Sequence, residues 1–257
     1  MRFIINKLSR IKFYYKRKCL LKYLLLRFIK GYKIEEKHEN YLIVRNIFNK
    51  VIFKVINHPE YLVSIDPLNE LLVDSYINIQ KGIFIDLGAF VGKYALKIAK
   101  NKNVKVIAVE PNPQTFQLLI ESAALNRIGD NFVPLNLAIY KVNNVLIDFE
   151  TNYSMSKIVF DKKEENSIKV KTISIEDVFI NFAVDYSLPY LIKIDVEGFE
   201  VEIIKDLLPF LRNIKDVKIV CEILPQNKDR IFIIETLQSS GFNFEQIDQS
   251  NYFFEKT

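Results

Sequence analysis

The chain has 257 residues, of which 49% are apolar and 20 are Phe, so it is long enough for one large domain, or a domain with an extension, and is not predicted to be disordered. Its two cysteines, Cys19 and Cys221, exclude a disulfide framework or a metal finger and fit a reducing compartment. The net charge of +5 is unevenly distributed, because residues 1–34 contain eleven Lys or Arg and no Asp or Glu. The remaining 223 residues carry 25 basic and 31 acidic residues and are mildly acidic.

Residues 1–34 are expected to be a basic helical extension, in which the apolar spacing of residues 2–30 predicts one or two helices. Lys22 and Arg27 interrupt the apolar residues 19–29, so this extension is neither a signal peptide nor a membrane span. It can lie on an anionic membrane surface or cap the domain or a second subunit, as in a homo-oligomer. Nucleic-acid contact is a third alternative. We expect a cytoplasmic protein, peripheral at the inner face of the membrane if the first role holds.

Residues 35–80 lead from this extension into the core domain. The apolar patterns of residues 41–45 and 51–56 predict a β-hairpin. The pair His58-Pro59 predicts a surface turn, because a lone His beside Pro is more typical of a turn than of a catalyst. Apolar residues at a period of 3.6 then predict a helix over residues 67–79.

The core domain, residues 81–257, is organised around one glycine-rich turn. Residues 82–85 predict a strand, residues 86–92 a sharp turn and residues 93–100 a helix. Three of the seven glycines of the chain fall in this window. A strand, a glycine turn and a helix start can hold a ligand against backbone N–H groups at the carboxyl end of a strand.

Strands and helices then alternate along the core domain. This alternation is typical of a parallel α/β sheet with helices on both faces. Two further strands interrupt it, with a polar loop between them, and an antiparallel pair closes the chain. Strands are expected at residues 104–109, 132–137, 144–150, 167–172, 217–222, 242–245 and 252–254 and from residue 190 onward, and helices at residues 114–126, 199–210 and 229–239 and from residue 174 onward.

Two carboxylates lie at the carboxyl ends of neighbouring strands of this sheet. Asp86 precedes the glycine turn, and Glu110 follows the next strand, where an acid can accept hydrogen bonds from both hydroxyls of a ribose. The turn has Gly88-x-x-x-Gly92 rather than GxGxxG, so no second glycine makes room for a pyrophosphate. The pattern therefore favours a ligand with ribose and adenine but no phosphates, and S-adenosylmethionine is the common one.

Four segments carry a more specific resemblance. IDLGAFVGKYALKIAK, VIAVEPNPQTFQLLIESAALN, NLAIY and LIKIDVEGFEVEIIKDL resemble the FkbM family of S-adenosylmethionine-dependent methyltransferases, in the same order and spacing over roughly residues 60–257. The resemblance implies the Rossmann-like, seven-stranded methyltransferase sheet, with strand order 3-2-1-4-5-7-6 and the last strand antiparallel. It also implies S-adenosylmethionine as the cofactor.

The resemblance further implies which residues bind this cofactor. The residues expected at its methionine end are Asp86, Gly88, Ala89 and Gly92, and Phe90 in the same turn is also expected to bind the cofactor. Glu110 would hold the ribose, Pro111 and Asn112 would flank the adenosine, and Ala138 would lie next to the adenine. The chain departs from the family in having Tyr140 and Lys141 where Ser-Asp is frequent, so an acidic contact to the adenine amino group is absent or comes from Asp130.

Lys193, Asp195 and Glu197 alternate along the fourth strand of the sheet and its exit, which places them on one side. Methylation of a hydroxyl requires loss of its proton, so Asp195 is the candidate base, Lys193 the electrostatic partner and Glu197 a further candidate. The two carboxylates could instead bind Mg²⁺, but no third ligand is identifiable, and a structural ion pair is the other alternative. Glu222 ends the next strand at the same edge, where it can face the substrate.

These residues predict an S-adenosylmethionine-dependent O-methyltransferase. The family and the basic extension favour a sugar hydroxyl of a glycan, a glycolipid or a similar small acceptor. Two alternatives remain: a nucleic-acid methyltransferase that uses the basic extension, and a non-catalytic protein that only binds the cofactor.

Overall fold

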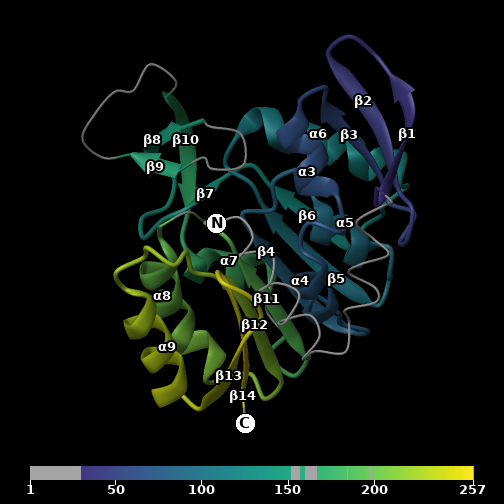
Figure 1. Cartoon of the computed structure of the whole chain (residues 1–257). Coiled ribbons are helices and arrows are strands. Elements are labelled where there is room, and N and C mark those ends of the chain that lie inside the picture. The colour runs from purple at the N-terminus through teal and green to yellow at the C-terminus, as the bar shows by residue number, and fades with distance from the viewer. Residues whose placement is uncertain (1–29, 152–156, 160–166, 184, 197, 257) are drawn as a thin grey trace, which may run out of the picture.

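The computed structural model describes residues 30–151, 157–159, 167–183, 185–196 and 198–256 (Figure 1). The helix expected within residues 2–30 lies outside this part of the chain, as does Glu197. Within the described residues, no helix combines the length and the apolar character that a membrane crossing needs.

A seven-stranded sheet forms the centre of the molecule. Its order is β6-β5-β4-β11-β12-β14-β13, and β14 runs antiparallel to both of its neighbours. In chain order this is 3-2-1-4-5-7-6, so the predicted fold class is confirmed. The strands span Gly82–Leu87 (β4), Val104–Val109 (β5), Phe132–Leu135 (β6), Tyr190–Ile194 (β11), Val217–Glu222 (β12), Phe242–Gln246 (β13) and Asn251–Lys256 (β14).

Helices cover both faces of this sheet, because alternate side chains of each strand point to opposite faces. Ile83, Ile85 and Leu87 of β4 pack in one core with α7, α8 and α9, whereas Phe84 packs in the other with α3, α4, α5 and α6. The helices span Pro59–Ile65 (α3), Leu71–Tyr76 (α4), Lys93–Ala99 (α5), Pro113–Leu125 (α6), Ile175–Phe182 (α7), Glu200–Leu211 (α8) and Arg230–Ser239 (α9).

The segment before the core contains a sheet of three antiparallel strands, β1 (Tyr32–Lys37), β2 (Tyr41–Asn46) and β3 (Ile52–Ile56). The predicted hairpin is β2 and β3, and the prediction missed β1, whose side chains are mostly exposed. This sheet lies beside α6 at one edge of the molecule (Figure 1).

Two predictions between β3 and β4 were wrong. His58 is the N-cap of α3, because its side chain accepts a hydrogen bond from the backbone N–H of Glu60 and Pro59 occupies the first turn. The predicted surface turn is therefore the start of a helix. The predicted helix over residues 67–79 is shorter, because Asp66 accepts hydrogen bonds from the N–H groups of Leu68 and Asn69 and holds a turn before α4.

The strands that interrupt the alternation of strands and helices form a small second sheet, in the order β7-β10-β8-β9. The two predicted strands are β8 (Leu146–Glu150) and β10 (Ser167–Ile173), which pair antiparallel. The prediction missed β7 (Ala138–Ile139) and β9 (Lys157–Val159). Because β7 pairs with β10 and leaves the central sheet, β6 ends at Leu135, earlier than predicted.

Asn126 ties the three-stranded sheet to α6, and its loss should destabilise the protein. Its side-chain amide donates to the Ile52 carbonyl at 2.6 Å, and its oxygen accepts from the Ile52 N–H at 2.9 Å. We expect Asn126→Ala to lower the free energy of unfolding by about 1–3 kcal/mol, because both groups of Ile52 lose their partner. Urea denaturation measures this loss. Asn243→Ala, at an exposed site on β13, is the control, and an equal loss in both variants would contradict the role of Asn126.

Candidate active site

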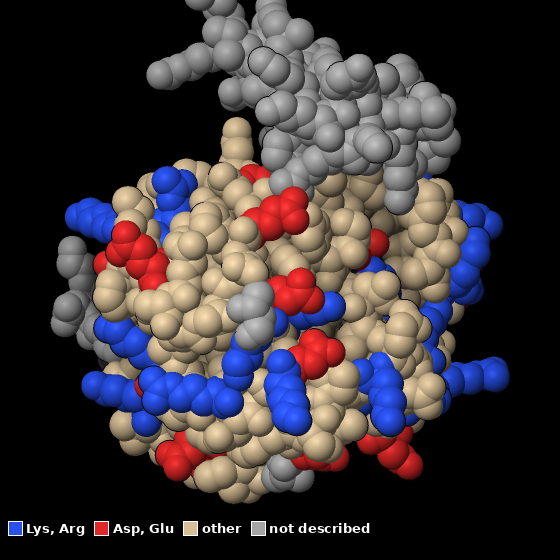
Figure 2. Space-filling view, turned by 90° about the horizontal axis from the view of Figure 1, so that it is seen from below, with Lys and Arg blue, Asp and Glu red and all other residues tan. Residues whose placement is uncertain are grey.

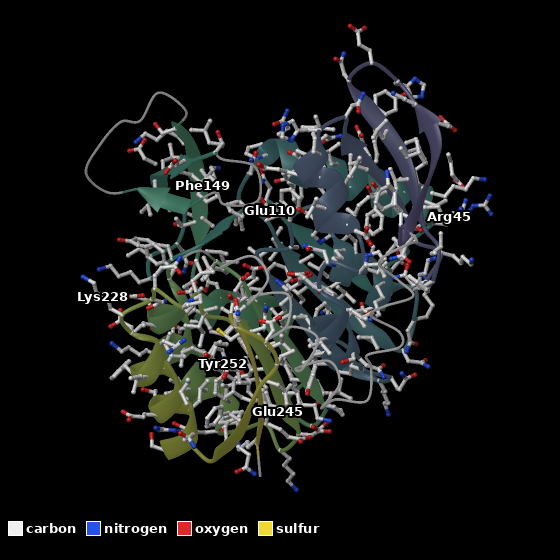
Figure 3. All side chains as sticks on the ribbon, in the orientation of Figure 1. Arg45, Glu110, Phe149, Lys228, Glu245 and Tyr252 are labelled. Carbon is white, nitrogen blue, oxygen red and sulfur yellow. The ribbon has the colours of Figure 1, made fainter. Side chains whose placement is uncertain are left out.

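A cavity of about 510 Å³ opens at the carboxyl ends of β4, β5, β11 and β12. Glu110, after β5, and Phe149, on β8 of the small sheet, both line it and come from different sheets (Figure 3). The predicted site residues that the cavity brings together are Asp86, Gly88, Ala89, Phe90, Glu110, Pro111, Ala138, Lys193 and Asp195. Gly92 and Asn112 do not line it, and Glu197 lies outside the described residues.

Gly88 lies where the turn after β4 meets the end of β11. Its φ is +85°, and a Cβ there would lie 1.9 Å from the carbonyl oxygen of Asp195, so only glycine fits. Gly92 has a different role. It is the N-cap of α5, and a Cβ there would lie 2.3 Å from Cδ1 of Leu119 on α6. The spacing Gly88-x-x-x-Gly92 therefore combines one glycine at the cavity with one that packs α5 on α6.

The backbone N–H groups of this turn are largely used within the protein. Those of Gly88 and Ala89 donate to the carbonyl of Val109, and that of Phe90 donates to a carboxylate oxygen of Glu110 at 2.8 Å. The turn thus shapes the wall of the cavity, and these three N–H groups are not free to donate hydrogen bonds to a phosphate. This differs from the expectation that backbone N–H groups would hold the ligand.

Glu110 is buried and is fixed by three hydrogen bonds. Besides the Phe90 N–H, its carboxylate accepts from the Asn112 N–H at 2.9 Å and from Oγ1 of Thr115 at 2.8 Å. Burial raises the pKa of Glu110 to about 7, although these three hydrogen bonds oppose the shift. Asn112 also caps α6 by accepting from the Gln114 N–H, so it positions the acid rather than facing the cavity. Thr115 was not predicted, and its place in the first turn of α6 was its only signal.

Asp86 is buried at the end of β4 and faces the cavity. Its Oδ1 atom has no hydrogen-bond partner among the described residues. Burial raises the pKa of Asp86 to about 7, with Lys193 opposing the shift and Asp195 adding to it. A buried acceptor without a partner costs free energy, so a hydrogen-bond donor that reaches this oxygen would be stabilised.

Lys193 and Asp195 form an ion pair in the same cavity, with 2.6 Å between Nζ and Oδ2. Lys193 is 5% exposed, and its register partner on β4 is Asp86. Burial by itself lowers the pKa of Lys193, but Asp195, Asp86 and Glu70 outweigh burial and raise this pKa above its usual range. Lys193 therefore stays charged and stabilises the carboxylates around it.

The family model of the methyltransferase FkbM domain matches residues 86–250, which include Asp86, Glu110, Lys193 and Asp195. The chain belongs to the FkbM family of methyltransferases. It is 28% identical over 174 residues to the hexuronic acid methyltransferase AglP of Haloferax volcanii, which covers 60% of this chain and 70% of AglP. It is 29% identical over 122 residues to a tRNA (guanine(37)-N(1))-methyltransferase of Paramecium tetraurelia, covering 45% of this chain and only 26% of that relative.

Solved structures of low identity also match this FkbM-family protein. TYW2 of Pyrococcus horikoshii is 14% identical with a TM-score of 0.44, over 87% of this chain and 72% of TYW2. The METTL16 methyltransferase domain is 12% identical with a TM-score of 0.43, over 93% of this chain and 78% of that domain.

Three further residues of the FkbM-family site were not predicted. Glu70, just before α4, accepts hydrogen bonds from Nζ of Lys93 and from the hydroxyl of Tyr94, both at 2.8 Å. Burial by itself raises the pKa of Glu70, but Lys93 and Lys193 outweigh burial and lower this pKa to about 2. The Tyr94 ring in turn lies 5.5 Å from Nζ of Lys193. Lys93 and Tyr94 follow the glycine turn directly, but nothing in the sequence connects them to Glu70.

Among the residues that the structure describes, no group of three or more His, Cys, Asp or Glu side chains is arranged to hold a metal ion. The carboxylates of the cavity are instead associated with Lys193, Lys93 and hydrogen-bond donors of the protein.

The close approach at Gly88 can be tested by substitution. We expect Gly88→Ala to destabilise the protein more than Gly241→Ala, because both positions have a positive φ but only position 88 lacks room for a Cβ. The left-handed backbone alone should cost Gly241→Ala about 1–2 kcal/mol. Urea denaturation of both variants separates this strain from the collision with Asp195. Equal losses would show that position 88 has room for a side chain.

Proposed function

We propose that this FkbM-family protein is an S-adenosylmethionine-dependent O-methyltransferase that acts on a sugar hydroxyl of a glycan, a glycolipid or a similar small acceptor. One observation carries the proposal. The Lys193–Asp195 pair, which can take the proton of a hydroxyl, lies in the same cavity as the glycine turn and the two buried acids Asp86 and Glu110. A protein that only binds the cofactor has no need of such a pair.

The cavity residues fit S-adenosylmethionine. The unpartnered Oδ1 of Asp86 suits the cationic amino group of the methionine end, and the carboxylate of Glu110 suits the ribose hydroxyls. Pro111 and Ala138 offer apolar surface to the adenine. The turn keeps its N–H groups for Val109 and Glu110, which favours a ligand without phosphates.

When bound, the cofactor supplies an electrophilic methyl group on a sulfonium and leaves as the neutral thioether. The residues of the protein remove the proton of the acceptor hydroxyl. A carboxylate oxygen of Asp195 accepts the proton of the acceptor hydroxyl as the new O–CH₃ bond forms and the C–S bond breaks. The Lys193 ammonium stabilises negative charge on the acceptor oxygen and on Asp195.

A sugar acceptor is supported by the outer wall of the cavity. This wall combines polar side chains of Glu60, Ser64 and Asn69 with the apolar side chains of Phe149 and Leu224. Sugars present hydroxyl groups together with apolar ring faces, so a wall of this mixed character suits them. The similarity to AglP, which is named for methylation of a hexuronic acid, points the same way. A lipid-linked acceptor would also account for the basic extension at residues 1–34 as a membrane contact.

A nucleic-acid acceptor is the second candidate, since the chain also resembles tRNA methyltransferases. Those similarities cover 26% and 12% of the two relatives, far less than the 70% of AglP. The face seen from below carries Asp and Glu side chains between its Lys and Arg side chains (Figure 2). A face that mixes both signs of charge is less favourable for the phosphate backbone than one of Lys and Arg alone.

Cofactor binding should depend on pH. Asp86 and Glu110 each have a pKa near 7 in the free protein, and both are expected to bind the cofactor as carboxylates. The affinity for S-adenosylmethionine should therefore rise between pH 6 and pH 8, by about tenfold for each group that must ionise. Isothermal titration calorimetry at the two pH values measures this.

The matched variants Asp86→Asn and Glu110→Gln should bind at least about tenfold more weakly and with a smaller pH dependence. Glu245→Gln, on the distant strand β13, should behave as the wild type (Figure 3). The absence of binding heat at high micromolar S-adenosylmethionine in the wild type would refute the proposal.

Asp195→Asn should separate binding from chemistry. The variant keeps the shape of the side chain but cannot take a proton, so methyl transfer should fall by about 10²–10⁴-fold while cofactor affinity stays within about twofold. The acceptor for this assay can be identified by mass spectrometry of glycans and lipids from cells with and without the protein. The mass of the acceptor should differ by one methyl group between the two samples. Unchanged turnover in the purified variant would remove Asp195 from its role as base.

A further inference from the structure

Glu222 lies beside Asp195 because of the register of two parallel strands. β11 and β12 pair with Lys193 opposite Val220 and Ile194 opposite Cys221. Continuing by one residue brings Asp195 opposite Glu222, and side chains in register on parallel strands point to the same face. Both carboxyl groups line the same cavity, where Asp195 is close enough to Glu222 to raise its pKa.

Among the described residues, the charged groups that act on Glu222 are Asp195, Lys193 and Glu70. Lys193 pairs directly with Asp195, and Glu70 approaches from the segment before α4. On the other side, the register partner of Glu222 on β14 is the uncharged Asn251. The negative charge of Asp195, together with burial, raises the pKa of Glu222 well above the usual range of a carboxyl group. Glu222 therefore carries its proton at neutral pH.

We propose that Glu222 is a positioning residue, which donates its proton in a hydrogen bond to Asp195 and so orients the carboxylate that takes the proton of the acceptor hydroxyl. Asp195 is then held by Lys193 on one side and by Glu222 on the other. This inference rests on the proposed O-methyl transfer, and nothing in the family match assigns the role to Glu222.

A pair of adjacent carboxyl groups that shares one proton is suited to this chemistry. Two adjacent negative charges repel each other, so one group stays protonated while the other remains an acceptor. Asp195 takes the proton from the acceptor oxygen, and Glu222 keeps its own proton throughout, so no further proton donor or acceptor is needed. The contribution of Glu222 is the fixed geometry of Asp195, which aligns it with a hydroxyl bound at the outer wall of the cavity.

The protonation of Glu222 can be tested without cofactor or acceptor. Infrared difference spectroscopy of the full-length protein at pH 7, wild type minus Glu222→Gln, should contain the carbonyl band of a protonated carboxyl group. Glu245→Gln, at an exposed position, is the control and should yield only carboxylate bands. A wild-type minus Glu222→Gln spectrum with only carboxylate bands would overturn the inference. It would do so independently of whether the protein transfers methyl groups.

The positioning role has its own kinetic test, with the acceptor found by mass spectrometry. Gln retains a donor to Asp195 whereas Ala does not, so Glu222→Gln should keep kcat within about threefold and Glu222→Ala should lose about 10–100-fold. KM for S-adenosylmethionine should change in neither variant. The decline of kcat at alkaline pH, where wild-type Glu222 loses its proton, should be absent from Glu222→Gln. Equal losses in both variants, or an unaltered pH profile in Glu222→Gln, would overturn the role while leaving the proposed function intact.

Discussion

The buried ammonium of Lys193 is the interaction on which the cavity depends. It lies in register with Asp86 on β4, is paired with Asp195 at 2.6 Å, and lies near Glu70. Without this cation, several carboxyl groups at the end of one sheet would repel one another and would have to be protonated. Lys193 helps to lower the pKa of Glu70 and opposes the rise in the pKa values of Asp86 and Glu222, which burial and Asp195 cause. Lys193 therefore favours the ionised form of each acid that surrounds it.

The glycine turn acts mainly through its shape. At Gly88 the backbone approaches the carbonyl of Asp195 so closely that no side chain fits, and this contact joins the cofactor side of the cavity to the proposed catalytic pair. The N–H groups of the turn bond to Val109 and Glu110, so the position of the turn is linked to the acid after β5. The residues proposed for binding and for chemistry therefore depend on one another for their positions.

The outer wall of the cavity comes from elements added to the sheet. α3 provides Glu60 and Ser64, and β8 of the small sheet provides Phe149. The central sheet thus provides the acids proposed for cofactor binding and proton transfer, whereas the added elements face the space that remains for an acceptor. Differences in acceptor among related proteins should therefore be sought in these additions rather than in the sheet.

The residue pattern of the sequence by itself determined the elements of the central sheet and most of the cavity, and the resemblance of its motifs to the FkbM family implied the strand order. Residues such as Asp86, Glu110 and Asp195 directly follow or end apolar strands, and the ends of parallel strands meet at one edge, so local pattern is enough to bring them together. Only the tertiary structure decided which N–H groups were already used, that Gly92 packs α5 on α6, and that Glu70 joins Lys93 and Tyr94. The same holds for the placement of Asp195 beside Glu222, which follows from the register of β11 and β12. Register, close packing and contacts between distant segments depend on how elements fit together in space, and no local pattern of residues records that fit.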